Sequence, residues 1–186
     1  MKRIFDFIIA LILLIVLLPL FFLVAGLVIT TSKGPIFYCS DRIGKNNKIY
    51  KMPKFRSMRV NTPALATHLL DNPDLYLSPI GKFLRRSSLD ELPQIFSILK
   101  GDMSFVGPRP ALFNQNDLIK LRSKKNIDKL LPGLTGWAQI NGRDELSITE
   151  KVALDEIYYK NHCFSFDIKI IWMTILKVIK KEGVSH

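Results

Sequence analysis

The residues best suited to chemistry lie in one stretch, Arg85 to Gln94, which reads Arg-Arg-Ser-Ser-Leu-Asp-Glu-Leu-Pro-Gln. Two adjacent acids, Asp90 and Glu91, follow two arginines there. An ionised carboxylate that meets a phosphate group can ligate Mg²⁺, which takes hard oxygen ligands, or it can attack phosphorus and form an acyl phosphate. Because adjacent residues do not share a helix face, Asp90 and Glu91 can divide these two roles.

The same stretch also has the pattern of a helix start. Ser88 and Glu91 have the spacing of a capping box. Pro93 opposes that cap, because a proline that far into the helix breaks a hydrogen bond. With Asp90 as the cap, Pro93 falls in the first turn, where amide protons have no helical partner, and Asp90 lies in a positive field that also attracts phosphate. The spacing leaves capping and catalysis both open.

A second candidate is the run Gly107-Pro108-Arg109-Pro110. The flanking prolines restrict the backbone around Arg109, and a planar guanidinium fixed in this way suits bidentate binding of phosphate. The alternative is an ordinary turn with a solvated arginine. Lys54, Arg56 and Arg143 add further cations. Phosphoryl transfer depends mainly on positioning and charge neutralisation, so this set of residues fits it.

The composition narrows the class of ligand. With 27 Lys and Arg against 16 Asp and Glu, the formal net charge is +11, which indicates a phosphate-bearing ligand, an acidic lipid or a nucleic acid. The two cysteines are far apart and show no metal-ligand spacing, so we expect neither a zinc site nor a disulfide framework. No Walker, Rossmann or Gly-x-Ser-x-Gly motif is present.

No residue from Phe7 to Ser32 is charged. The stretch is too long for a signal peptide and long enough to cross a bilayer as a helix. Pro19 predicts a kink near its middle, and Lys2, Arg3 and Lys33 make both flanks basic, which favours a cytoplasmic position for both ends. A spanning helix and a re-entrant helix that bends at Pro19 both remain open on these residues. A long uncharged segment of this kind argues against a nucleic-acid-binding protein.

The remaining chain predicts a single α+β domain. We expect a hairpin over 36–52, a loop over 61–79, a broken helix over 81–100, a helix over 114–131, a loop over 132–136, a short strand over 137–140 and a helix over 149–160. From Asp167 to Lys181 apolar residues recur at helical spacing among lysines, which is typical of a helix at a membrane interface or of one packed on the core.

Five ordered blocks carry a resemblance that runs from about Arg3 to Ser185. They are Lys54–Met58, Ser88–Gln94, Gly101–Pro110, Pro132–Gly136 and Asn141–Arg143. In these blocks the chain resembles the bacterial sugar transferase family, the monotopic phosphoglycosyl transferases, and is most similar to its small members. The resemblance implies a re-entrant membrane helix over 1–32, a cytoplasmic catalytic domain over 33–186 with interfacial amphipathic helices, and a place on the cytoplasmic face of the bacterial inner membrane.

The resemblance also implies an activity. Asp90 attacks the sugar-linked phosphate of a UDP-sugar, UMP leaves, and polyprenol phosphate (undecaprenyl phosphate) then takes the sugar phosphate. Mg²⁺ sits beside the dyad, with Asp90 and Glu91 as its ligands and Glu91 assisting catalysis. The donor suggested by the small members is an N-acetylated amino sugar. The implied partners are the phospholipid membrane and downstream glycosyltransferases, and no nucleic acid.

Individual positions carry over as well. Arg85, Arg109 and Arg143 match arginines that hold phosphates or the nucleotide, and Lys54 matches a basic residue near the lipid. Leu18-Pro19 is a departure, because small members often have Ser before this proline. A rival function from another class is a non-catalytic basic module that binds anionic lipid, which would leave the acidic pair and the Gly-Pro-Arg-Pro turn without a purpose.

Overall fold

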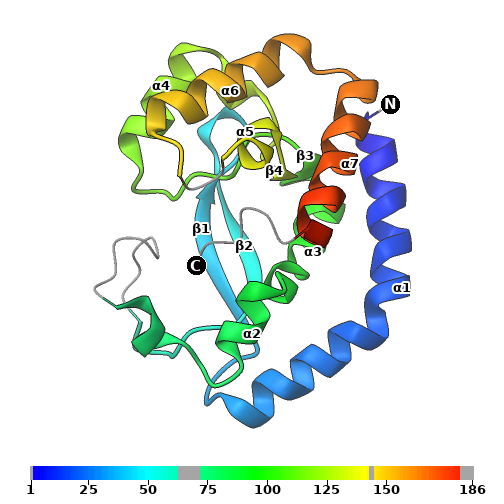
Figure 1. Cartoon of the computed structure of the whole chain (residues 1–186), viewed down its shortest axis with the longest axis vertical. Coiled ribbons are helices and arrows are strands. Elements are labelled where there is room, and N and C mark those ends of the chain that lie inside the picture. The colour runs from blue at the N-terminus through cyan, green and yellow to red at the C-terminus, as the bar shows by residue number, and fades with distance from the viewer. Residues whose placement is uncertain (1, 63–71, 143–144, 181–186) are drawn as a thin grey trace.

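A computed structural model of the chain describes residues 2–62, 72–142 and 145–180 (Figure 1). It mixes helices with two small sheets, which confirms the mixed helix-and-sheet class that the sequence predicted. The α-helices are α1 (Lys2–Thr31), α2 (Gly81–Arg86), α3 (Gln94–Lys100), α4 (Asn116–Lys124), α5 (Trp137–Ile140), α6 (Ile148–Asn161) and α7 (Phe164–Lys180). The strands are β1 (Phe37–Ile43), β2 (Ile49–Phe55), β3 (Ser104–Val106) and β4 (Gly133–Thr135), and short 3₁₀ helices are η1 (Lys45–Asn47), η3 (Pro73–Tyr76), η4 (Leu89–Glu91) and η5 (Ile127–Lys129).

Helix α1 is 30 residues long, contains Pro19, and is long and apolar enough to cross a membrane by length and composition. It is drawn as two arms joined at a bend (Figure 1). A proline inside a helix removes one backbone hydrogen bond, so the bend agrees with the predicted kink. Many of its apolar side chains are exposed, with Ile15, Val16 and Phe22 each more than 60% accessible. An exposed apolar surface of this extent is typical of a membrane or partner contact.

Strands β1 and β2 form the hairpin that the sequence predicted. They pair antiparallel from Phe37 with Phe55 to Ile43 with Ile49. The connection contains Asn46 and Asn47 at φ values of 55° and 58°, a left-handed conformation that asparagine tolerates better than most residues. Because side chains alternate along a strand, one face of the hairpin is directed inward and the other outward.

The second sheet was not predicted. Strands β3 and β4 pair in parallel, Ser104 with Gly133 and Val106 with Thr135, although residues 132–136 read as a loop. The prediction of a strand at Trp137–Ile140 was also wrong, because these residues form helix α5 with Ala138 and Ile140 buried. A short apolar run does not distinguish a strand from one buried helical turn, and tertiary packing decided between them.

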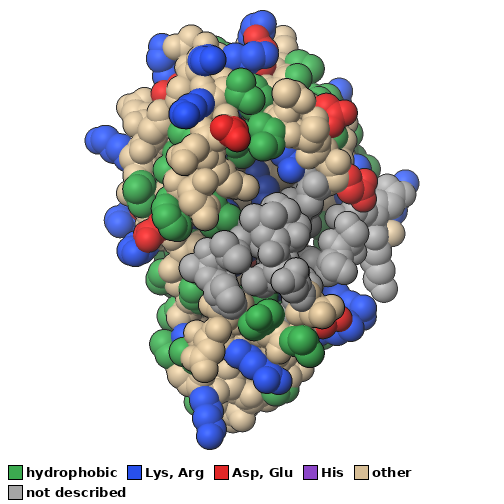
Figure 2. Space-filling view, turned by 90° about the vertical axis from the view of Figure 1, so that its left-hand side faces the viewer, with side chains coloured by type: hydrophobic (Ala, Val, Ile, Leu, Met, Phe, Trp, Pro, Cys, Tyr) green, Lys and Arg blue, Asp and Glu red, His purple; other side chains and the backbone are tan. Residues whose placement is uncertain are grey.

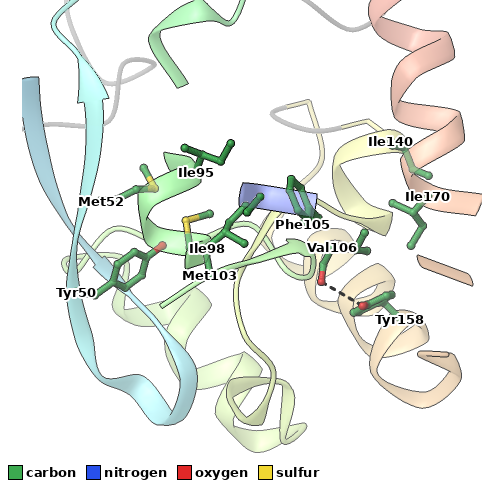
Figure 3. Packing of buried hydrophobic residues seen from close by; sticks show 11 residues of the cluster. Tyr50, Met52, Ile95, Ile98, Met103, Phe105, Val106, Ile140, Tyr158 and Ile170 are labelled. Atoms are coloured by element: carbon green, nitrogen blue, oxygen red, sulfur yellow. Dashed lines mark hydrogen bonds between the residues drawn. The ribbon is translucent and has the colours of Figure 1, made fainter. Parts of the chain in front are cut away.

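The largest core cluster joins α1, β2, α3, β3, α5, α6 and α7, with Ala10 as its buried residue from α1 (Figure 3). Ile98, Met103 and Ile170 have no exposed surface there. The Tyr158 hydroxyl reaches the backbone carbonyl of Val106 over 3.2 Å. A smaller cluster packs the second arm of α1 against β2 and α2. The two clusters therefore hold α1 to the rest of the chain at both of its arms.

Helices α6 and α7 lie close to where the sequence predicted them. Ser147 and Glu150 form a capping box that starts α6, since each accepts a hydrogen bond from the other's backbone N–H. On α7 Ile170 is fully buried, whereas Trp172 and Ile175 are 61% and 46% exposed. One side of this helix therefore packs on the core, as one of the two alternatives predicted, and another side presents exposed apolar groups. Its place at a membrane interface stays a prediction.

Candidate active site

Strand β2 and the turn η4 bring a lysine to one acid of the dyad. The Lys54 ammonium donates a hydrogen bond to Oε1 of Glu91 over 2.6 Å, and the two side chains are 18% and 17% exposed. Charges with so little exposure are screened less by salt than surface charges are. The pair therefore fixes the Glu91 carboxylate and brings positive charge toward its neighbour Asp90.

Asp90 is nearly buried, with 6% of its surface exposed. Burial raises the pKa of its carboxyl, and the negative charge of Glu91 acts in the same direction. The positive charges of Lys54 and Arg85 oppose that rise in pKa. A poorly hydrated carboxyl between cations and next to a cleft is a candidate functional group.

Neither helix-cap prediction holds. Helix α3 begins only after Pro93, which is its N-cap residue, and no side chain caps it. Ser88 has a left-handed φ of 54°, so the chain forms the separate turn η4 with both acids in it. A proline at the cap loses no helical hydrogen bond because its missing N–H had no partner there. The dyad thus lies one turn ahead of the helix, and capping does not explain the two acids.

Arg85 reaches the same place from α2. Its Nε donates to the Ser57 hydroxyl over 3.2 Å, and its Nη2 lies 3.1 Å from the sulfur of Met58. Burial lowers its pKa, and the charges of Asp90 and Glu91 act against that shift. The structure therefore groups Arg85 with the dyad, as the sequence predicted.

Arg109 borders the same small cleft as the Lys54–Glu91 pair. The turn around Arg109 is packed tightly against the segment around Gly133. A Cβ atom on Gly133 would lie 2.1 Å from the Gly107 nitrogen. Only glycine fits such an approach. A separate hollow, lined in part by Ile43, Ile119 and Ile127, contains neither acid of the dyad.

Arg42 also lines the cleft, and the sequence analysis missed this role. Burial lowers its pKa most, followed by the nearby positive charge of Arg109. Its signal lies in the hairpin register, which pairs Arg42 with Tyr50 and Ser40 with Met52. These residues share one face of the hairpin with Lys54, so strand alternation marks Arg42 once the register is known.

The remaining predicted residues are less central. Arg56 is 8% exposed, and its Nη1 donates to the backbone carbonyl of Lys33 over 3.3 Å, so its contact is with the connection from α1 to β1. Its role in substrate binding stays a prediction. Arg143 lies outside the described residues. Leu18 and Pro19 lie within α1, in the part that carries its exposed apolar surface.

The charged side chains that line the cleft are mostly cations. Arg42, Lys54 and Arg109 line it together with a single acid, Glu91, and Asp90 is the residue immediately before Glu91. One face of the molecule shows more Lys and Arg than Asp and Glu side chains around its described upper part (Figure 2). Convergent cations in a partly dry site attract phosphate more strongly than solvated ones do.

The model of the bacterial sugar transferases matches residues 1–181. The chain belongs to the bacterial sugar transferase family. It is 39% identical to the exopolysaccharide production protein ExoY of Sinorhizobium fredii, over 98% of this chain and 87% of that protein. It is 37% identical to the uncharacterized sugar transferase EpsL of Bacillus subtilis, over 100% of this chain and 91% of that protein.

A third relative is a longer protein. The UDP-glucose:undecaprenyl-phosphate glucose-1-phosphate transferase of Klebsiella pneumoniae is 39% identical over 95% of this chain, which covers 39% of that enzyme. Nearly all of the present bacterial sugar transferase therefore aligns with less than half of the longer enzyme.

Proposed function

We propose that this bacterial sugar transferase moves a sugar 1-phosphate from a UDP-sugar to polyprenol phosphate. The observation that carries the proposal is the nearly buried Asp90 beside the Lys54–Glu91 pair and Arg85, next to a cleft lined by Arg42 and Arg109. Relatives whose names state this kind of reaction support it, including the glucose enzyme of Klebsiella pneumoniae and the undecaprenyl-phosphate galactose phosphotransferase of Salmonella typhimurium.

In the proposed first step an oxygen of Asp90 attacks the phosphorus that carries the sugar. A P–O bond forms to Asp90, the P–O bond to the leaving UMP breaks, and an acyl phosphate bearing the sugar remains on the enzyme. Arg42 and Arg109 hold the phosphate oxygens in line for the attack, and Lys54 keeps Glu91 in place.

In the second step a phosphate oxygen of the polyprenol phosphate attacks the same phosphorus. The bond to Asp90 breaks, its carboxylate is restored, and polyprenyl-diphospho-sugar leaves. Since the cleft cations are fixed by the fold before the substrate binds, they lower the energy of charge that develops on the phosphate oxygens. Glu91 lies next to Asp90 and assists both steps by orienting the groups around the phosphate.

The dyad fits a Mg²⁺ ion that is shared with the substrate. The described residues hold no group of three His, Cys, Asp or Glu side chains that suits a metal. Mg²⁺ often binds through one or two carboxylates plus substrate phosphates and water, so a pair of acids is sufficient. Asp90 and Glu91 would hold it, and when bound it neutralises charge on the diphosphate of the donor.

The contacts of α1 favour a re-entrant helix. At its start the Lys2 ammonium donates to the Val106 carbonyl over 2.9 Å and to the Tyr158 hydroxyl over 2.8 Å, and it pairs with Asp167 at 2.7 Å. Arg3 donates to two backbone carbonyls at the end of α3. The beginning of α1 is thus held against the catalytic part of the chain.

The second arm of α1 is held by the same part of the chain. Val24 and Val28 are buried and pack with Phe55 of β2 and Leu84 of α2. A helix that crossed the bilayer would separate its two ends by the membrane, whereas both arms here contact one body. We therefore propose that α1 enters one leaflet, bends near Pro19 and returns, with both ends on the cytoplasmic face of the inner membrane.

The topology is tested by cysteine labelling in intact cells. Cys39 and Cys163 are exposed, so both are first replaced by serine. Single cysteines near position 2 and at Lys33→Cys are then treated with a membrane-impermeant maleimide. Protection of both positions until the cells are opened is expected, and labelling of either from the periplasm would exclude the re-entrant arrangement.

The activity is tested as UMP release from a panel of UDP-sugars, with undecaprenyl phosphate and with or without a chelator of Mg²⁺. The panel contains the N-acetylated amino sugars that the sequence suggests and the glucose and galactose donors that the relatives' names mention.

The covalent step is tested without lipid, by measuring the mass of the intact protein and of its peptides. A mass increase of one sugar phosphate on Asp90 is expected, whereas vesicle binding without UMP release from any donor would favour the non-catalytic lipid-binding module.

A further inference from the structure

The turn that carries Arg109 is held along its whole backbone. Each residue from 107 to 111 has a hydrogen-bond partner from another segment. The Gly107 N–H donates to the Thr135 carbonyl, and the carbonyls of Pro108 and Ala111 accept from the N–H groups of Gly133 and Ile43. The carbonyls of Arg109 and Pro110 accept from Nη1 of Arg122 and Nη1 of Arg42. Three of these partners are backbone groups. The other two are arginine side chains, which hold the carbonyls of residues 109 and 110.

Arg122 differs from Arg42 because it lies away from the dyad. It belongs to α4, and its Nη1 donates to the Arg109 carbonyl over 2.8 Å. Its Nε and Nη2 donate to one oxygen of Asp155 in α6, over 3.0 and 2.7 Å. The side chains of Arg122 and Asp155 are 11% and 1% exposed. Because the guanidinium is planar and rigid, holding its Nε and Nη2 on Asp155 directs Nη1 to the Arg109 carbonyl.

We propose that Arg122, held by Asp155, is a positioning residue that sets the placement of the Arg109 side chain toward the donor phosphate. The inference rests on the proposed function, in which Arg109 contacts that phosphate. The Arg109 carbonyl is attached to the same Cα atom as its side chain, so its anchor fixes the direction in which the guanidinium leaves the backbone. The two prolines fix their own φ angles, which leaves few other ways to move.

The low exposure of Arg122 explains why it is paired with Asp155. A lone buried arginine would be strongly destabilising, and Asp155 compensates its charge. A displacement of about 1 Å at a substrate-positioning group can lower a rate by about a hundredfold. The clamp made by Asp155, Arg122 and the Arg109 carbonyl therefore acts on turnover by placing the Arg109 side chain.

The test compares two conservative variants of the full chain in detergent or nanodiscs. Arg122→Lys keeps the charge beside Asp155, but an ammonium cannot bridge the carboxylate and the Arg109 carbonyl with the same fork. The matched control is Lys125→Gln, which removes the ion pair between Lys125 and Glu156 of α6, near the same two helices but without contact to the turn. We expect Arg122→Lys to lower kcat/KM for UMP release about tenfold and Lys125→Gln to leave it unchanged.

A double-mutant cycle separates positioning from general damage. In an Arg109→Ala background, Arg122→Lys should change kcat/KM by less than about twofold, because its effect passes through the missing side chain. A further tenfold loss in that background would overturn the inference, and so would a wild-type rate for Arg122→Lys with Arg109 present. The thermal midpoint of each variant is measured beside its rate.

Failure of the proposed function is distinguished by a readout that needs no turnover. If the wild type releases UMP from no donor, the proposed function fails, and amide hydrogen exchange of the peptide over 105–113 then tests the clamp. Faster exchange in Arg122→Lys than in Lys125→Gln is expected from the lost carbonyl anchor. Equal exchange in the two variants would show that Arg122 does not hold the turn.

Discussion

Lys54–Glu91 and Arg122–Asp155 are both ion pairs with little exposed surface, but they differ in what can reach them. Lys54 meets Glu91 through one 2.6 Å contact at the border of the basic cleft. Arg122 donates two hydrogen bonds to Asp155, whose side chain is 1% exposed, and a third to a backbone carbonyl. Both charges of the first pair border that cleft, whereas Asp155 of the second pair is shielded from solvent and Arg122 borders only the separate hollow.

This difference separates two uses of charge in one small protein. Around the dyad the cations border a cleft, and burial raises the pKa of the Asp90 carboxyl. Behind the Arg109 turn the charges complete one another and hold the backbone. Variants in the first region should therefore change activity more than stability, and variants in the second should change stability as well.

The largest effect is expected for Asp90→Asn. Its amide cannot attack phosphorus, so UMP release should fall by more than about a thousandfold. The raised pKa of Asp90 means that its ionisation lowers the stability of the fold as the pH rises through that pKa. At neutral pH the thermal midpoint of Asp90→Asn should therefore be equal to or above that of the wild type. Retained turnover, or loss of the fold, would contradict the role of Asp90.

The closed pair should show the largest effect on stability. Asp155→Ala leaves the charge of Arg122 buried without its partner, which costs about 3–5 kcal/mol in the free energy of unfolding. Denaturant unfolding of the purified protein measures it. The control is Asp41→Ala, which removes an exposed pair with Lys51 on the hairpin. Equal unfolding midpoints for the two variants would show that burial does not distinguish these pairs.

The pH profile should report the environment of Asp90. Because the carboxylate must be ionised to attack and burial raises its pKa, turnover should fall on acidification at a pH above the ordinary carboxyl range, by about tenfold per unit below that pKa. Lys54→Met removes a charge that lowers this pKa, so it should move the midpoint of the profile to higher pH. A midpoint that stays in place or moves down would separate Lys54 from Asp90.

The smallest effect is expected for Arg109→Lys. The charge remains but the planar fork is lost, so turnover should fall about tenfold, or about 1.4 kcal/mol of transition-state binding. Arg86→Lys, at an exposed arginine next to Arg85, is the control and should change nothing. If Arg109→Lys turns over UDP-sugar at the wild-type rate, the turn does not position phosphate.

Several features could be predicted from local patterns. The hairpin, the break between α2 and α3, and α6 and α7 all follow from periodicity and from turn residues. The two acids and the two arginines before them lie in one run, so their proximity needed no tertiary information. The helix cap at Asp90 was wrong because Ser88 takes a left-handed conformation that no spacing rule anticipates.

By itself the sequence determined the long apolar helix with its proline and the positive net charge. It also determined the groups able to act on phosphate, which are the acidic dyad and the proline-flanked arginine. Only the tertiary structure decided which of these groups meet. Lys54 and Glu91 are 37 residues apart, and Arg122 and Asp155 are 33 apart. Sequence patterns report forces between neighbours a few residues apart. Pairs at such separations form only when the core brings their elements together, and that is why Arg42 and Arg122 emerged from the fold.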